Sequence, residues 1–486
     1  MDRSFVFEEA TIAELAAKLT TGEVTARALA EAYLTRIDTV DQAGPTLRSV
    51  IEVNPDALAI ADALDTERRD GRVRGPLHGI PILVKDNIDT ADHMKTTAGS
   101  LALVEARPAA DAPVVAHLRA AGALLLGKTN LSEWANFRST RSSSGWSGRG
   151  GQCHNPYALD RNPSGSSSGS GVAVSANLCA AAVGTETDGS ILSPATANGI
   201  VGIKPTVGLV SSAGIVPISH TQDTAGPMAR TVADAAALLA AMTGAASTPA
   251  LDPGALRGAR IGAARNLAGF DARVDSLFDD ALGVLRTLGA EVIDPADIPH
   301  ASDLEEPEWE VLTFEFKTDL EAYLGRLDGD APRSLAALIA FNEAYAEQEM
   351  PHFGQEIFER SAEKGPLTEP AYLEALATCA RLSREEGVDA VLAQHTLDAV
   401  VAPTGAPAWL TDHVNGDHVI GGNSSPAAVS GYPSVTVPMG FVAGLPVGLS
   451  FIGGPRSEPA MIGYAFAFER ATEHRGVPRL IQTLEE

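Results

Sequence analysis

The run Gly79-Ile-Pro-Ile-Leu-Val84 is the stretch of sequence on which the fold assignment depends. It is short, apolar and rich in β-branched residues, which is typical of a strand buried on both faces of a sheet. A second such run, Ala123 to Leu126, follows a helix-like segment that begins at the cap residue Asp111 and stops at Gly122. Because a helix followed by a short buried strand is typical of layered α/β proteins, the sequence predicts an α/β fold with a buried sheet.

The same alternation continues along the chain. Thr11-Ile-Ala-Glu14 spells a capping box for an N-terminal helix. Residues 260–293 alternate between strand and helix patterns, and residues 305–396 are predominantly helical. No clear linker marks the ends of the helical stretch, so we expect one large domain over residues 1–486. Further strands are predicted at 49–53, 179–183, 199–204, 434–438 and 447–452, and further helices at 56–69, 171–178, 231–242 and 459–472.

Composition excludes several classes of protein. The 486 residues are 45% apolar and 20% charged, enough to bury a sizeable core, and the net charge is −26. Such an acidic surface repels phosphate and anionic lipid, which disfavours nucleic-acid and membrane partners. The three cysteines, Cys153, Cys179 and Cys379, fit a reducing compartment. With neither a signal-peptide pattern nor an apolar run of about 18 residues, we expect a soluble, cytoplasmic enzyme.

Three motifs match a functional pattern by spelling but not by context. Gly122 to Thr129 fits a phosphate-binding loop, yet its interior is Ala and three Leu, which belong in a buried strand. Gly165-Ser-Ser-Ser-Gly169 fits a nucleophile elbow, yet a loop and not a strand precedes it. His413 and His418 flank a polar turn that is a weak candidate for metal binding. We therefore predict neither a nucleotide site nor a metal site from these motifs.

Three features at the ends of predicted elements could carry chemistry. Lys85 follows the buried run, and a lysine there is usually a surface residue with its ammonium group in water. The serine-rich tract Ser164 to Ser170 precedes a predicted helix, for which a serine is an ordinary N-cap. Gly184 to Ser190 follows a strand and reads as a glycine-containing turn. Each feature has a structural explanation when taken alone.

Taken together, these features resemble one known family. Its motifs occur here in order, with a 24-residue step from Ser166 to Ser190. They are Gly79-Ile-Pro-Ile-Leu-Val-Lys-Asp86, Pro163-Ser-Gly-Ser-Ser-Ser-Gly-Ser170, Gly184-Thr-Glu-Thr-Asp-Gly-Ser-Ile191, Val201-Gly-Ile-Lys-Pro205, Gly431-Tyr-Pro-Ser-Val-Thr-Val-Pro-Met-Gly440 and Gly444-Leu-Pro-Val-Gly-Leu449. The chain resembles the amidase signature family over nearly its whole length. The resemblance implies a large mixed β-sheet covered by helices on both faces, a signature core at about 75–245, a helical insertion at about 305–396 and no cofactor or metal.

The resemblance also implies a Ser–Ser–Lys triad. By motif position Ser190 is the nucleophile that forms an acyl-enzyme, Ser166 is a bridge that follows a cis peptide bond from Gly165, and Lys85 is the base. The backbone N–H groups of four successive residues are expected to bind the oxyanion, as such groups do in other acyl-transfer enzymes. These residues are Thr187, Asp188, Gly189 and Ser190.

Two positions depart from the family pattern. The usual Gly-Gly-Ser-Ser-Gly-Gly reads Ser164-Gly-Ser-Ser-Ser-Gly169 here, and the first glycine before the nucleophile is Asp188. Members that act on peptide amides share both changes, so they bear on substrate range more than on chemistry.

Lys85 can act as a base only if it is neutral. Lowering its pKa from about 10.4 to about 7–8 takes roughly 3 units, or about 4 kcal/mol, which burial of a lysine can supply. Asp86 and Asp89 would oppose this shift if they lay close to the amine. Ser166 can pass a proton from Ser190 to Lys85 because a hydroxyl both donates and accepts.

Within the family, Lys128 to Arg138 and Gln222 to Arg230 most resemble the bacterial peptide amidases, which remove the C-terminal amide of peptides. We therefore expect hydrolysis of a carboxamide on a peptide or small molecule, with release of ammonia. Trp134, Asn136 and Phe137 either line the substrate cleft or pack in the core. The alternatives are an amidase of other small amides, a transamidating subunit of an aminoacyl-tRNA amidotransferase, and a non-catalytic relic. The sequence does not determine acyl-side preference or oligomeric state.

Overall fold

Eleven strands form one continuous mixed sheet in the computed structural model, which describes residues 5–245, 248 and 250–484. Their order across the sheet is β1-β4-β2-β7-β9-β8-β14-β15-β13-β10-β11. The strands are β1 Val50–Val53, β2 Pro81–Lys85, β4 Leu124–Thr129, β7 Ala181–Glu186, β8 Val201–Lys204, β9 Thr224–Ala229, β10 Arg260–Ala263, β11 Glu291–Ile293, β13 Ala399–Pro403, β14 Ser434–Val442 and β15 Leu445–Ile452. The short pairs are β3 Ala106–Arg107 with β12 Asp328–Gly329, and β5 Trp146–Ser147 with β6 Gly151–Gln152.

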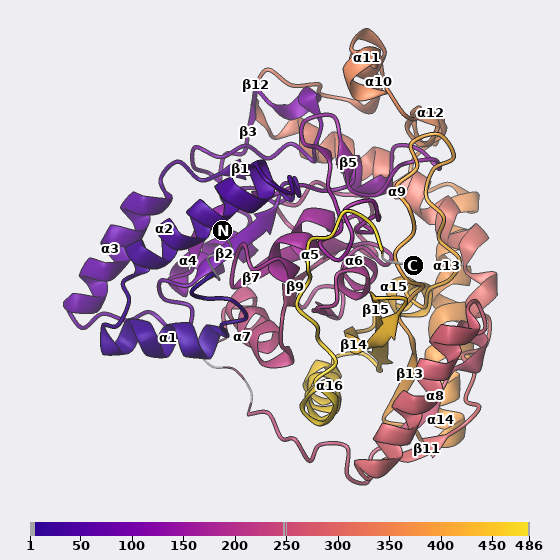
Figure 1. Cartoon of the computed structure of the whole chain (residues 1–486). Helices are drawn as coiled ribbons and strands as arrows, with labels where there is room; N and C mark the ends of the chain where they lie inside the picture. Colours follow the sequence, from indigo (N-terminus) through magenta and orange to yellow (C-terminus); the bar gives the residue numbers. More distant parts are fainter. Residues whose placement is uncertain (1–4, 246–247, 249, 485–486) are drawn as a thin grey trace.

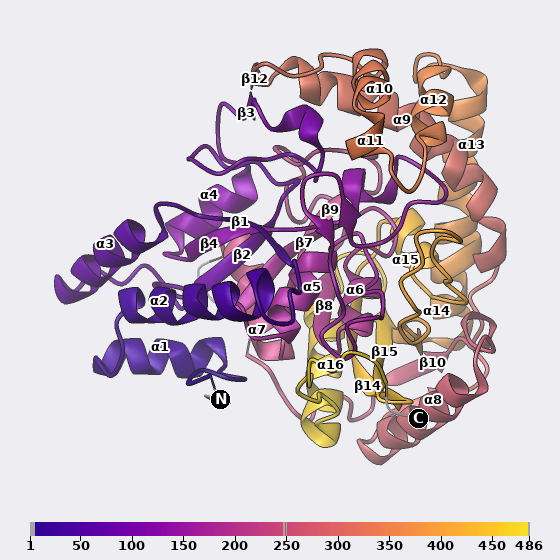
Figure 2. The ribbon, with the colours of Figure 1, turned by 45° about the horizontal axis from the view of Figure 1, so that its top comes forward.

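Helices cover both faces of this sheet, as the resemblance implied (Figures 1 and 2). The indigo N-terminal helices lie at one end of the molecule, and the orange helices α9–α13 line the opposite side. The α-helices are α1 Ile12–Thr21, α2 Ala26–Arg36, α3 Ala57–Arg69, α4 Pro113–Ala120, α5 Ser168–Ser175, α6 Leu192–Ala197, α7 Val232–Met242, α8 Ala272–Thr287, α9 Glu305–Gly325, α10 Leu335–Ala344, α11 Ala346–Glu349, α12 Glu356–Ala362, α13 Pro370–Ala380, α14 Asp389–His395, α15 Ser425–Ser430 and α16 Glu458–Thr472.

Local sequence signals account for most of these elements. Thr11 and Glu14 form the predicted capping box of α1. The Ala-and-Leu run inside Gly122–Thr129 lies in the fully buried strand β4, which agrees with the rejection of a phosphate loop. One prediction is wrong, because α4 is capped by Ala112 and not by Asp111. The Asp111 carboxylate accepts from the backbone N–H of Ala91 instead, since that donor lies across the loop and lacks another partner.

The strand order brings two predicted site segments to one edge. β2 runs parallel to β7, with Val84 beside Val183. Because the carboxyl ends of parallel strands meet at the same edge of a sheet, Lys85 at the end of β2 lies beside the loop that leads from β7 to Ser190. In the part of the chain that the structure describes, no helix is long and apolar enough to cross a membrane.

Candidate active site

A cavity of about 500 Å³ opens at this edge of the sheet. Its floor includes Thr187, Asp188 and Ser190 from the loop after β7, with Ser164 and Gly165 from the serine-rich tract. The start of α9 and the segment 405–421 complete its walls. Predicted catalytic and oxyanion residues therefore lie together at a hollow of the size that small-molecule sites have.

Lys85 is completely buried below this cavity. Its Nζ lies 2.8 Å from Ser166 Oγ, 3.1 Å from Ser167 Oγ and 2.9 Å from Thr185 Oγ1. The side chain is therefore not the solvated surface lysine that its position after a strand would usually indicate.

The hydrogen bonds around Lys85 give each hydroxyl a different role. Ser167 Oγ donates to the carbonyl of Thr185 at 3.0 Å, so its proton is already engaged. Thr185 Oγ1 accepts from Asn87 Nδ2 at 3.0 Å as well as from the lysine. Ser166 Oγ contacts only Lys85 among the residues that the structure describes. Ser166 is therefore the hydroxyl that is free to exchange a proton with the amine.

Burial lowers the pKa of Lys85 to about 7. The carboxylates of Asp223 and Glu186 oppose this shift, Asp223 more strongly. We expected Asp86 and Asp89 to oppose the lowering of the Lys85 pKa, but neither is among the charged groups that act on Lys85. Tyr323 donates to Asp89 at 2.7 Å, which holds that carboxylate in a separate contact.

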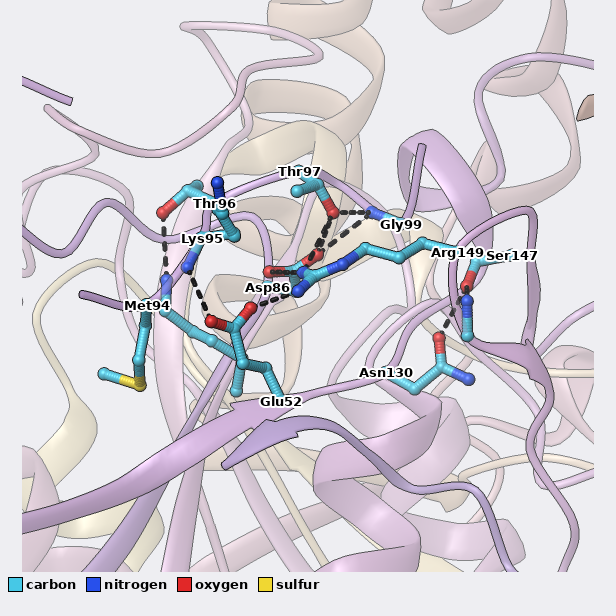
Figure 3. Close-up of polar contacts among 12 residues, drawn as sticks. Glu52, Asp86, Met94, Lys95, Thr96, Thr97, Gly99, Asn130, Ser147 and Arg149 are labelled. Carbon is cyan, nitrogen blue, oxygen red and sulfur yellow. Dashed lines mark hydrogen bonds and ion pairs between the residues drawn. The ribbon is translucent and has the colours of Figure 1, made fainter. Parts of the chain in front are cut away.

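Asp86 is adjacent to Lys85 in sequence but faces a different set of groups (Figure 3). Its carboxylate pairs with Arg149 Nη1 at 3.3 Å and accepts from Thr97. Arg149 also contacts Glu52 on β1. Successive strand residues point to opposite faces, so the Asp86 charge is neutralised away from the amine of Lys85.

Ser190 ends the loop that follows β7. Glu186 Oε2 accepts from the N–H groups of Ile191 at 2.7 Å and Leu192 at 3.0 Å, which fixes the start of α6 directly after Ser190. Gly189 has φ +78°, a left-handed conformation that favours glycine. Among the described residues, none accepts a hydrogen bond from the N–H groups of residues 187–190. These donors are free for an oxyanion.

The serine-rich tract folds back onto the same loop. The N–H of Ser167 donates to the carbonyl of Ser190 at 3.1 Å, and the peptide bond Gly165–Ser166 is cis. A Cβ at Gly165 would lie 2.2 Å from Ser132 Oγ, so any larger residue there would have to displace the Ser132 side chain. In the described chain no hydrogen bond joins the side chains of Ser166 and Ser190, which leaves the Ser190 hydroxyl at the cavity wall without a protein partner.

Of the three predicted cleft residues, Asn136 and Phe137 line the cavity. Trp134 lies behind them, 2% exposed, with its ring against Phe358 in an apolar cluster. Trp134, Ala135 and Asn136 all have φ between 50° and 69°, a run of left-handed residues that turns the chain toward the cavity. Such strain is found mainly at functional sites.

The sequence reasoning missed several groups around the site. Ser167, Thr185 and Asp223 all lie in stretches that the motifs singled out, but the motifs gave none of them a role toward Lys85, which the fold assigns. Trp409 and Asp417 line the cavity from a segment whose sequence carried no catalytic signal.

Metal binding receives little support from the geometry. In the described chain, one group of residues brings together three side chains that could ligate a metal ion. It consists of His220, Glu315 and Asp319. Glu315 already accepts from Ser219, Thr221 and Tyr372, so its oxygens are occupied. His413 stacks on His352 at 4.0 Å between ring centroids and belongs to no such group.

The chain belongs to the amidase family, whose model (Amidase) matches residues 28–462. It is therefore an enzyme that hydrolyses the carbon–nitrogen bond of amides, and the resemblance seen in its motifs is confirmed. The native peptide amidase of Stenotrophomonas maltophilia is 51% identical with a TM-score of 0.92, over 98% of this chain and 100% of that chain. A probable amidase of Arabidopsis thaliana is 42% identical over 99% of this chain and 93% of its own length. One subunit of the glutamyl-tRNA(Gln) amidotransferase of Chloroflexus aurantiacus is 36% identical over 97% of this chain and 98% of its own length.

Proposed function

We propose that this enzyme hydrolyses the C-terminal carboxamide of peptides through an acyl-enzyme on Ser190. The observation that carries the proposal is a completely buried Lys85 whose Nζ lies 2.8 Å from Ser166 Oγ, beside the loop that presents Ser190 to the cavity. Lysine supplies the base, Ser166 the relay and Ser190 the nucleophile. A serine hydroxyl needs such a base because it is a weak nucleophile by itself.

In the first half of the reaction, Ser190 Oγ attacks the amide carbon while its proton passes to Ser166, whose own proton passes to neutral Lys85. The negative oxygen is held by the backbone N–H groups of the loop that ends at Ser190. The relay then returns a proton to the amide nitrogen, the carbon–nitrogen bond breaks and ammonia leaves. Water deacylates the Ser190 ester by the same relay and yields a carboxylic acid.

Two observations support a peptide substrate. The chain is 51% identical to a peptide amidase over 98% of its length. The cavity has apolar walls beside the reacting groups, including Phe137, Trp309 and Trp409. A hollow of about 500 Å³ accommodates the end of a peptide and not a folded chain.

The proposal is tested by incubating the purified chain with an amidated peptide and measuring ammonia and mass. We expect a gain of about one mass unit with the peptide intact, since replacing –NH₂ by –OH does this. Ser190→Ala is expected to lower kcat about 10⁴-fold. Peptide fragments, or a Ser190→Ala variant with undiminished ammonia release, would contradict the proposal.

Ser166→Ala and Ser167→Ala form a matched pair for the relay. Both hydroxyls contact Lys85, but only Ser167 has its proton engaged elsewhere. We expect Ser166→Ala to lose far more of kcat than Ser167→Ala, and equal losses would remove the relay role of Ser166.

A transamidating role within a larger amidotransferase is the second candidate, favoured by the 36% identity with the Chloroflexus aurantiacus protein. The net charge of −26 disfavours direct contact with tRNA. Ammonia release from peptide amides by the isolated chain, without ATP or a partner, distinguishes the two. An amidase of other small amides would act on simple amides in preference to the peptide in the same assay.

A further inference from the structure

Two carboxylic acids face each other in the wall of the cavity. Asp188 lies two residues before Ser190, and Glu308 lies in the first turn of α9. Both line the cavity, and each carboxyl lies near enough to the other to change its pKa. Ser425 Oγ donates to Asp188 Oδ2 at 2.7 Å, and Gln222 Nε2 donates to Glu308 Oε1 at 2.7 Å. Asp188 stands where the family pattern has glycine, so the pair is a departure from that pattern.

The two acids influence each other's ionisation. Burial raises the pKa of both carboxyls, and their mutual repulsion raises that of Glu308 further. Their proximity lowers the pKa of Asp188 and raises that of Glu308. Asp188 is therefore the acid of the pair that ionises more readily, and Glu308 the one that holds a proton more readily.

No cation in the cavity wall offsets this charge. Among the described residues that line the cavity there is no lysine, arginine or histidine, and Asp417 adds a third acid. A cation that acts on Asp188 is Lys204, which does not line the cavity. Lys204 is buried and also interacts with Glu186 and Glu458, so its single charge is divided among several carboxylates.

We propose that the Asp188–Glu308 pair determines which acyl groups the cavity accepts, admitting neutral and cationic ones and rejecting anionic ones. This inference rests on the proposed function and adds a charge rule to it. A neutral carboxamide enters beside the pair, whereas a peptide with a free C-terminal carboxylate, or with an acidic residue next to the scissile amide, is repelled. The carboxylate product of the reaction is repelled by the same charge, which promotes its release.

Binding measurements on the full chain in a Ser190→Ala background test the rule without requiring turnover. The ligands are N-acetylglutamine amide and N-acetylglutamate α-amide, which have nearly the same shape and differ by one charge. With the native wall we expect the glutamine ligand to bind about tenfold or more tightly by calorimetry, the size of effect that a nearby partly buried charge has.

Three variants of the cavity wall show which of the two acids is responsible for the preference. Glu308→Gln leaves the Asp188 carboxylate in the wall, so it is expected to retain the preference. The double variant Asp188→Asn with Glu308→Gln removes both acids and is expected to bind the two ligands equally. Asp188→Asn alone is expected to show an intermediate preference for the glutamine ligand, because Glu308 can ionise once its neighbour is neutral.

Equal binding by the native wall, or a preference that survives in the double variant, overturns the inference. A preference lost in Glu308→Gln alone overturns the assignment of the charge to Asp188. The proposed function is judged separately by ammonia release from neutral peptide amides with Ser190 restored. If the chain shows the binding preference but releases no ammonia, the inference about the cavity wall stands and the proposed function is wrong.

Discussion

At the scale of single residues, the environment of Lys85 is polar but contributes little charge. Three hydroxyls and one carbonyl surround its amine, and no carboxylate contacts it directly in the described part of the chain. A hydroxyl can donate to a neutral amine as well as accept from an ammonium ion, whereas a carboxylate in contact would hold the proton on the lysine.

The pH dependence of kcat/KM should report the ionisation of Lys85. The deprotonated amine is the active base, and burial lowers its pKa to about 7. We therefore expect kcat/KM for a neutral peptide amide to rise with pH through a midpoint at about pH 7 and to level off above it. A midpoint near the ordinary lysine value of about 10.4 would contradict a buried neutral base.

Asp223→Asn should move that midpoint to lower pH. The Asp223 carboxylate is the strongest of the charges that raise the pKa of Lys85, so its removal makes the amine easier to deprotonate. Asp86→Asn is the matched control, because Asp86 is adjacent in sequence but faces Arg149. An equal shift of the midpoint in both variants would contradict the structure, in which Asp223 acts on Lys85 and Asp86 does not.

Some residues of the site could be predicted from the sequence, and others could be found only in the structure. Lys85, Ser166 and Ser190 lie in ordered local motifs, and their assembly at one sheet edge follows from parallel strands. Asp223 and Glu308 act across the fold. Asp223 lies in a stretch that resembles the family, but that stretch does not show which charges the carboxylate influences, and nothing near Glu308 in sequence distinguishes it from other acidic residues. Their roles depend on burial, which only the packed structure sets.

At the scale of elements, α5 depends on close approach of its first turn to the sheet. The N–H of Gly169 donates to the carbonyl of Asn130 at 2.9 Å. A Cβ at Gly169 would lie 2.2 Å from the carbonyl oxygen of Ser49 and 2.5 Å from that of Asn130. The serine-rich tract is therefore rigid and not the flexible linker that its composition would favour.

Gly169→Ala should displace α5 and with it the serines that precede the helix. We expect a loss of about 1–3 kcal/mol in the free energy of unfolding, as overpacking of a core causes, and a lower kcat. Gly283→Ala in α8 is the control, since nothing lies within 4 Å of its new Cβ. That variant should gain about 0.5–1 kcal/mol, and thermal unfolding of the two proteins checks both signs.

Element boundaries were predictable where local chemistry sets them. Thr11 caps α1 and Thr231 caps α7 as their sequences indicate. The start of α5 at Ser168, ahead of the predicted Gly171, follows from tertiary contacts with the sheet. Asp111 was misassigned for the same reason, because a backbone donor from a distant loop competes for its carboxylate.

At the scale of the whole molecule, the contact between His352 and His413 connects two segments that are far apart in the sequence. His413 lies on the segment that walls the cavity, and His352 lies between α11 and α12. Their rings stack at 4.0 Å. Burial lowers the pKa of both, and the proximity of His352 lowers that of His413 further.

Acidification should loosen this contact. The neutral rings are favoured by the fold, so their contribution to stability is complete above about pH 6.5 and is lost as the pH falls through the lowered pKa values. We expect the protection factors of residues 411–421, which are corrected for the intrinsic exchange rate, to fall below about pH 6. The variant His352→Asn should weaken this pH dependence, because burial of His413 remains, and an undiminished dependence would assign it to other groups.

The order of strands is what local sequence could not supply. β14 pairs with β8, and β15 pairs with β13, so residues 434–452 lie in the interior of the sheet although they come near the end of the chain. Pairing across such separations is determined by the fit of whole layers and not by neighbouring residues.

This late hairpin constrains how the protein can be made. A ribosome has to pass residue 434 before the gap between β8 and β13 can begin to be filled, so the newborn chain carries an open strand edge on β8 from residue 204 onward. A premature stop before residue 434 would therefore yield an aggregating fragment and not a smaller enzyme. Fusion tags and split-protein designs should leave this hairpin attached to the rest.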